Sequence, residues 1–128
     1  MTPVGTVWDE LFGQVGDPLR AVTQFRNAKF ETRMRDDVRA QYTRAEDRTL
    51  VDRIIIDRLL SKPLEEEFKC GALTGSVHIF EDAQVLVQAH PKRPKTGYLV
   101  SIDRTENVRL GDLECCFEYL RTEAFGGE

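Results

Sequence analysis

Apolar residues near the start of the chain recur first at helical and then at alternating spacing. Between residues 6 and 15 they fall every three or four positions, which predicts one apolar stripe on a short helix. Residues 19–26 and 29–35 follow, separated by Asn27 and Ala28, and the second run alternates charged side chains with apolar or small ones. Such alternation is typical of a strand with one face in solvent, so we expect a hairpin.

The longest predicted helix begins at residue 43 and ends at about Leu60. Thr43 and Glu46 have the spacing of a capping box, and Pro63 marks the end of the segment. At about 100° per residue, one set of apolar side chains fans across half of the circumference. This set comprises Leu50, Val51, Ile54, Ile55 and Leu59. Ile56 and Leu60 fall on the far side. One sheet cannot cover both sides, so we expect a second apolar contact, from the first or last helix or from another copy of the protein.

The second half of the chain carries three alternating segments and a final helical one. Residues 71–80, 84–90 and 97–103 are strand candidates joined by turns, which predicts adjacent antiparallel strands. Residues 110–120 return to helical spacing, whereas residues 36–42 are polar and turn-like. The predicted order is therefore helix, strand, strand, helix, strand, strand, strand, helix.

The size and composition of the chain indicate one ordinary domain. Its 128 residues leave no room for a second core, and we expect the core to span residues 6–124, with frayed residues 126–128 after it. A net charge of −4 with 31% charged residues is neither an acidic tail nor a nucleic-acid footprint. The chain shows no signal peptide and no apolar run long enough to span a membrane, so we expect a cytoplasmic protein with reduced cysteines.

Residues that could hold a metal are present but badly spaced. His78 and His90 lie in neighbouring strand candidates, and with Cys70 they suggest a zinc site. No pair of them forms a chelating unit, and both histidines alternate onto the more polar face of their strands. We therefore expect solvated or cross-strand histidines and no metal.

Other reactive side chains have ordinary structural explanations. Cys115 and Cys116 are consecutive and point about 100° apart on a helix, so Cys116 is predicted to pack in the core, with a redox switch as the alternative. The acidic pairs at 36–37 and 81–82 fall in turns, where aspartate caps the backbone. The sequence lacks a glycine-rich phosphate loop and a nucleophile elbow. We expect no enzyme activity and no cofactor.

The most distinctive local feature is the loop at residues 91–96. Lys92, Arg93 and Lys95 stand between two prolines in an otherwise acidic protein, and they could contact phosphate, an acidic partner or an anionic membrane. The loop has no aromatic residues on which single-stranded bases could stack. Phe80 and Leu86 also stand out, because they lie on strand faces that the alternation otherwise makes polar. They are core if both sheet faces are covered, and otherwise extend an exposed apolar patch.

The order of segments from Thr6 to about Ala124 resembles the roadblock and related profilin-like modules. The resemblance implies an α+β fold: a five-stranded antiparallel sheet with the long helix on one face and the terminal helices on the other. It also implies a homodimer whose platform binds small GTPases or signalling complexes. The residues that it assigns to the dimer contact are Ile56, Leu60, Ser76, His78 and Phe80. Thr74, Gly75 and Ser76 depart from the pattern, because they make the proposed pairing strand locally weak.

Three short segments, residues 34–39, 80–83 and 99–104, are similar to a group of small archaeal proteins with no known activity. The leading hypothesis is therefore a non-enzymatic, homodimeric regulatory or scaffolding module. One alternative is a PAS-like small-molecule sensor with a cavity lined by Met34, Tyr98 and Phe117. Another is a nucleic-acid or membrane adaptor that acts through loop 91–96. The sequence does not identify the partner or the pathway.

Overall fold

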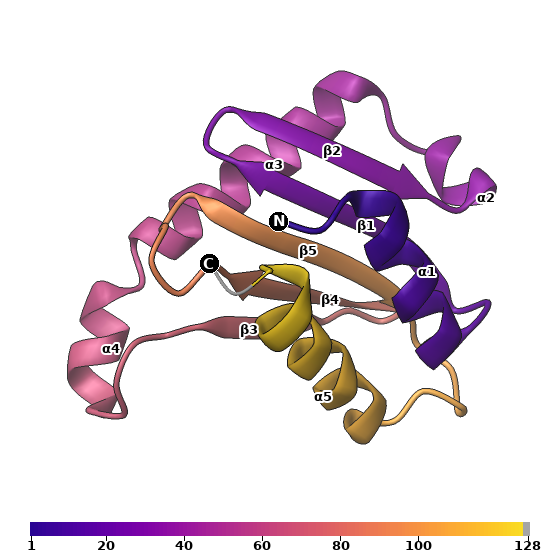
Figure 1. The fold of residues 1–128 in the computed structure, drawn as a ribbon. Coiled ribbons are helices and arrows are strands. Elements are labelled where there is room, and N and C mark those ends of the chain that lie inside the picture. Colours follow the sequence, from indigo (N-terminus) through magenta and orange to yellow (C-terminus); the bar gives the residue numbers. More distant parts are fainter. Residues whose placement is uncertain (127–128) are drawn as a thin grey trace.

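A computed structural model describes residues 1–126 and shows one five-stranded antiparallel sheet with helices on both faces (Figure 1). The strand order is β2-β1-β5-β4-β3. The elements are α1 (Val4–Val15), β1 (Leu19–Arg26), β2 (Lys29–Met34), α2 (Asp36–Arg39), α3 (Arg44–Leu59), α4 (Lys62–Phe68), β3 (Gly75–Ile79), β4 (Ala83–Ala89), β5 (Thr96–Asp103), α5 (Leu110–Tyr119) and a short π-helical turn (Leu120–Ala124). The predicted α+β fold, with a five-stranded antiparallel sheet and the expected succession of strands along the chain, is confirmed.

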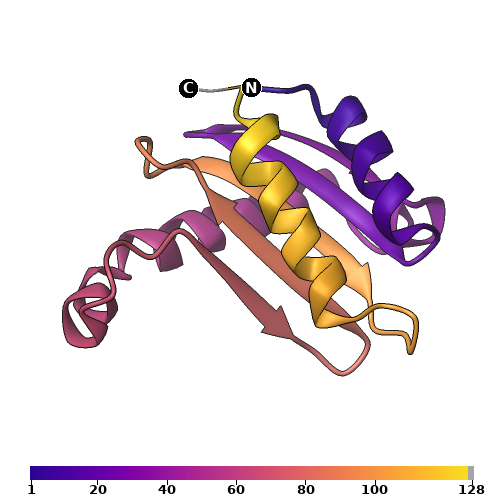
Figure 2. The same cartoon turned by 60° about the horizontal axis from the view of Figure 1, so that its bottom comes forward.

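The first face of the sheet, the α1/α5 face, holds the main core. Figure 2 shows α5 lying across the strands with α1 beside it. Val22, Leu86 and Val100 point into this layer from β1, β4 and β5, and each is completely buried. The Tyr98 hydroxyl donates to the carbonyl oxygen of Thr2 (2.9 Å), so the polar tip of this buried ring is satisfied. The main core therefore contains a hydrogen-bonded tyrosine as well as aliphatic side chains.

The opposite face, the α3 face, is covered only in part. Phe25 and Phe30 of the β1–β2 hairpin pack against Val51 and Ile55 of α3 in a separate apolar cluster. The helix begins at the predicted capping box, where Glu46 N–H donates to Thr43 Oγ1 (3.1 Å) and Thr43 N–H donates to Glu46 Oε1 (2.9 Å). Because α3 packs on the β1–β2 end of the sheet, strands β3, β4 and β5 have little helical cover on this face.

Two short helices occur where the sequence pattern predicts none. The turn-like stretch after β2 forms the single turn of α2, and the predicted end of the long helix at Pro63 is followed by α4. Pro63 lies in the first turn of α4, where its missing N–H has no helical partner to lose, so it starts one helix as the other ends. The first strand of the meander is also shorter than expected and begins at Gly75. The expected fraying falls partly on residues 127–128, which lie outside the described residues.

None of the helices within residues 1–126 is long and apolar enough to cross a membrane.

Candidate functional site: the groove beside the long helix

A groove of about 860 Å³ lies between α3 and the part of the sheet that α3 leaves uncovered. Leu50 and Ile54 form its wall on α3, and Val85 and Leu99 form its floor on β4 and β5. His78 and Phe80 extend it toward the β3 edge. The groove follows from the placement of α3, since the helix is anchored over one hairpin rather than over the centre of the sheet.

Paired charges close one end of this groove. Arg20 Nη1 donates to Asp103 Oδ1 (3.1 Å), and Arg35 Nη1 donates to Asp103 Oδ2 (2.7 Å). Arg35 also donates from Nε to Asp37 (2.6 Å), and this hydrogen bond lowers the pKa of the Asp37 carboxyl. The two arginines and two aspartates neutralise one another, so this network beside the groove is structural rather than a source of unpaired charge.

A buried carboxylate lies deeper in the groove lining, in the first turn of α3. Asp47 is only 3% exposed, and its Oδ2 lies 2.8 Å from Nη2 of Arg39. Its position near the helix N-terminus also favours a negative charge. Asp47 thus ties α3 to the α2 turn by an ion pair, although neither of its oxygens accepts a hydrogen bond within residues 1–126.

The residues assigned to a dimer contact lie on two sides of α3. Leu60, Ser76 and His78 line a second, smaller hollow near the C-terminal end of α3, and His78 also reaches the main groove with Phe80. Ile56 lies on the outer side of α3, away from both hollows. Phe80 is exposed whereas Leu86 is fully buried, so the first extends an exposed apolar surface and the second is core.

The predicted fan of apolar residues on α3 is only half covered by the sheet. Val51 and Ile55 are buried, but Leu50 and Leu59, which the pattern places on the same side, are 42% and 49% exposed. Further exposed apolar side chains, missed as site candidates, lie on α4 and β3: Leu64, Phe68, Val77 and Ile79. In the sequence these residues show the same apolar spacing as core residues do. The spacing alone does not indicate which positions the fold leaves uncovered.

The residues proposed for a PAS-like cavity are not brought together. Tyr98 belongs to the main core on the α1/α5 face, and Phe117 packs against that core, whereas Met34 lines the groove on the opposite face. Register explains the difference, because successive strand residues point to opposite sides of the sheet. The prediction of a cavity lined by these three residues is therefore wrong.

The two histidines have different environments. His78 is exposed at the groove, but His90 is 2% exposed, so the prediction that both lie on a polar face is wrong for His90. Its ring meets Phe125 edge-on at 4.9 Å between centroids, and its Nδ1 accepts the N–H of Lys92 (3.0 Å). Among the residues that the structure describes, no three histidine, cysteine or acidic side chains gather in a way that could hold a metal ion.

The cysteines behave as the helical geometry predicts. Cys116 is fully buried in the main core, and burial raises the pKa of its thiol to about 12. Cys115 and Cys70 are exposed and free. The buried thiol is protonated at neutral pH and therefore a poor nucleophile.

The basic loop is exposed at residues 91–95, at the end of the sheet, whereas Thr96 is buried as the first residue of β5. Asn27 N–H donates to the carbonyl oxygen of Lys95 (2.8 Å), which fastens the loop to the β1–β2 turn. Other cations lie at this end of the sheet: Arg26, Lys29, Arg44 and Arg48 line a shallow hollow around Phe30. The loop cations Lys92, Arg93 and Lys95 therefore share this end of the sheet with the cations of the neighbouring hollow.

Comparison with known proteins gives a family match and a fold match. The model of the family described as "Domain of unknown function (DUF7522)" matches residues 6–121. No curated protein sequence matches the chain.

Three solved structures share the fold. A structure described as "MglB with tetrameric arrangement" superposes with a TM-score of 0.69 at 15% identity, covering 94% of this chain and 83% of that one. The gliding protein MglB from Thermus thermophilus gives 0.68 at 14% identity, covering 91% and 82%. Myxococcus xanthus MglB gives 0.66 at 13% identity, covering 98% and 96%. The roadblock resemblance inferred from the order of segments is thus confirmed at the level of fold.

Proposed function

The chain belongs to the DUF7522 family and has the roadblock fold of MglB, and from this premise we propose that it is a non-enzymatic regulatory module that forms a homodimer and binds a protein partner such as a small GTPase. A shared fold alone does not carry a function. The proposal therefore rests on what the chain itself exposes, and one observation carries it: the exposed apolar residues of α3 and of its C-terminal cap.

Helix α3 exposes more apolar side chains than a surface helix needs. Ile56 and Leu60 are 51% and 71% exposed, and they add to the exposed Leu50 and Leu59 on the same helix. Covering such a side chain contributes about 1 kcal/mol or more. Exposed apolar surface of this kind marks an interface. It supports contact with a second apolar surface that the monomer does not supply.

The β3 strand supports a symmetric contact beside α3. Within residues 1–126, β3 pairs with β4 alone, so its other edge presents unpaired backbone groups. Ser76, His78 and Phe80 lie on or beside this edge strand, on the side that faces the hollows next to α3. A two-fold contact uses the same patch on both copies, and a strand edge next to an apolar helix is self-complementary. The "tetrameric arrangement" printed for one MglB structure is in keeping with self-association.

A different surface suits the partner. Lys92, Arg93 and Lys95 form an exposed cationic loop next to Arg26 and Lys29. Such a surface attracts an acidic protein through long-range electrostatics, which raises the rate of association more than the affinity. We assign this basic end to the protein partner and the α3–β3 surface to the second copy.

The test measures the mass of the protein in solution over a range of concentrations. The wild type is expected to be a dimer, and Ile56→Asp combined with Leu60→Asp is expected to give a folded monomer, because two buried carboxylates oppose the contact. Leu110→Asp is the matched control, since Leu110 is as exposed but lies at the start of α5. A wild type that stays monomeric throughout, or a double variant that still dimerises, would contradict the proposal.

A further inference from the structure

The smaller hollow beside α3, about 400 Å³, is lined by a cation, Arg58, that forms no ion pair within residues 1–126, although Asp57 also lines the hollow. It lies between the C-terminal end of α3, α4 and strands β3 and β4, and its lining is mostly apolar. The lining residues that the argument uses are Ile54, Arg58, Leu64, Val87 and Ala89. Arg58 contributes the positive charge.

Arg58 is held in an unusual state. Its Nε and Nη1 atoms are buried and find no hydrogen-bond acceptor among residues 1–126. Arginine stays protonated in proteins, so these donors cannot be neutralised by losing a proton. Although Arg58 as a whole is half-buried, leaving these two charged donors buried without an acceptor is unfavourable. The planar fork of a guanidinium matches a carboxylate, which accepts two parallel hydrogen bonds. A carboxylate on an apolar segment would therefore complement both Arg58 and the apolar part of the lining.

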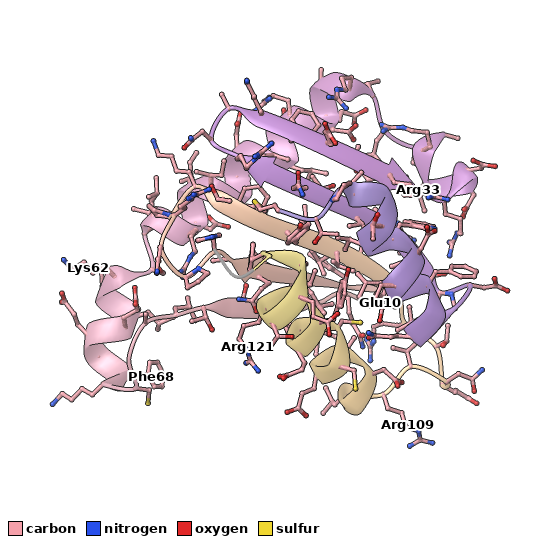
Figure 3. All side chains as sticks on the ribbon, in the orientation of Figure 1. Glu10, Arg33, Lys62, Phe68, Arg109 and Arg121 are labelled. Carbon is pink, nitrogen blue, oxygen red and sulfur yellow. The ribbon has the colours of Figure 1, made fainter. Side chains whose placement is uncertain are left out.

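Helix α4 has that chemistry and has little contact with its own domain. None of its residues is buried, and Leu64 and Phe68 are 46% and 69% exposed. Figure 3 labels its first and last residues, Lys62 and Phe68, on a helix that stands away from the sheet. A helix of seven residues is not stable on its own in water, so it needs a surface to pack on.

The acidic residues of α4 differ in what they contact. Glu65 already accepts the N–H of Leu73 (2.9 Å) and helps to hold the α4–β3 connection. Glu66 and Glu67 are exposed. Leu64 of the same helix forms part of the wall of the hollow, so the helix shapes the hollow from the side without filling it. A second α4 can bring both an apolar side chain and a carboxylate.

We propose that α4 of a second copy occupies this hollow, so that Glu66 or Glu67 of each copy pairs with Arg58 of the other. The inference rests on the proposed homodimer and names the residues that complete its site. The exchange is reciprocal, as a two-fold contact requires, because each copy offers one hollow and one α4. It gives the unpaired guanidinium its anion and covers the exposed apolar residues of α4 in the same contact.

A charge exchange tests the pairing directly. One variant carries Arg58→Glu, and the other carries Glu66→Lys with Glu67→Lys. Each alone is expected to dimerise about 30-fold more weakly than wild type or worse, as for loss of a buried charge pair. An equimolar mixture is expected to form a heterodimer with higher affinity than either homodimer. One of the two reciprocal contacts in the heterodimer pairs the introduced glutamate with the introduced lysines. The other pairs the native Arg58 with the native glutamates. Native mass spectrometry separates the two homodimers from the heterodimer when one variant carries an extended tag.

Controls separate this inference from the proposed function and from misfolding. Arg53→Glu, an exposed position on the same helix, is expected to dimerise like wild type. Arg58→Gln removes the charge but keeps a polar N–H donor, and it serves as a second variant if Arg58→Glu fails to fold. If the wild type dimerises but neither charge variant weakens it, or if mixing restores nothing, the α4 exchange is overturned while the homodimer stands. A wild type that is monomeric overturns both.

Discussion

Adding one methyl group at Gly97 is expected to destabilise the fold strongly. Gly97 lies in β5, the central strand, where β1 and β4 flank it on both sides. A Cβ atom at this position would lie 2.5 Å from the carbonyl oxygen of Gln88, 3.0 Å from the Phe25 ring and 3.2 Å from Cα of Ala89, whereas ordinary contact begins at 3.4 Å. The closest of these atoms is backbone, so the β4–β5 pairing must open to admit the methyl group.

The size of the effect follows from this geometry. Overpacking of a close-packed site costs about 1–3 kcal/mol, and a clash with the backbone of a central strand belongs at least in the middle of that range. We expect Gly97→Ala to lower the free energy of unfolding by about 2 kcal/mol. For a domain of this length, that corresponds to a fall in melting temperature of about 7 °C.

Gly13→Ala provides a matched control with the opposite sign. Gly13 lies inside α1 with nothing within 4 Å of the added Cβ, so the same methyl group is expected to stabilise the protein by about 0.5–1 kcal/mol. Thermal and urea unfolding followed by circular dichroism measure both variants. If Gly97→Ala is as stable as wild type, or if Gly13→Ala loses as much, the steric account of the central strand is refuted.

Two further predictions concern the thiols and the basic loop. Cys70 and Cys115 should react with a thiol reagent at about pH 8 in the folded protein, and Cys116 only after unfolding. Burial raises the pKa of Cys116 from 9.0 to about 12. The contribution of this thiol to stability is therefore complete below pH 9.0 and is lost as the pH rises toward about 12. Modification of all three thiols in the folded state would disprove the protection of Cys116. Replacing Lys92, Arg93 and Lys95 by serine should change stability by less than about 0.5 kcal/mol and weaken partner binding, and the wild-type complex should weaken as salt is added. A large loss of stability would show that the loop is structural, and salt-independent binding would remove it from the partner surface.

Local signals are sufficient for most elements of the fold. Thr43 and Glu46 start α3 through hydrogen bonds within one turn, and the alternation through Phe30 and Met34 places one side of β2 toward α3. Such features depend on residues a few positions apart, so they can be inferred from spacing. The strand candidates follow from the same segments, and adjacent ones pair as antiparallel neighbours.

Features that depend on distant residues cannot be inferred in this way. His90 alternates with Gln88 and therefore looks solvated, but Phe125 from the end of the chain covers it. Pro63 indicates an end to the long helix, although the same residue type also starts helices. Of the candidate site, the spacing predicts the uncovered Ile56 and Leu60 but not the groove. The groove depends on where α3 docks on the sheet, which no local pattern specifies.

The distribution of polar and apolar side chains differs from the distribution expected of a protein that is only a stable monomer. Gln24 and Tyr98 are buried in the main core and hydrogen-bonded to each other (3.0 Å), so these polar groups are satisfied. Ile56, Leu60 and Phe68 are exposed, and Arg58 keeps buried donors without an acceptor within residues 1–126. Most of the exposed large apolar side chains, together with Arg58, therefore lie around α3, α4 and β3, whereas Phe12 and Leu110 are exposed on α1 and α5. A single contact around α3, α4 and β3 that brings both apolar surface and a carboxylate would cover the apolar side chains there and pair Arg58.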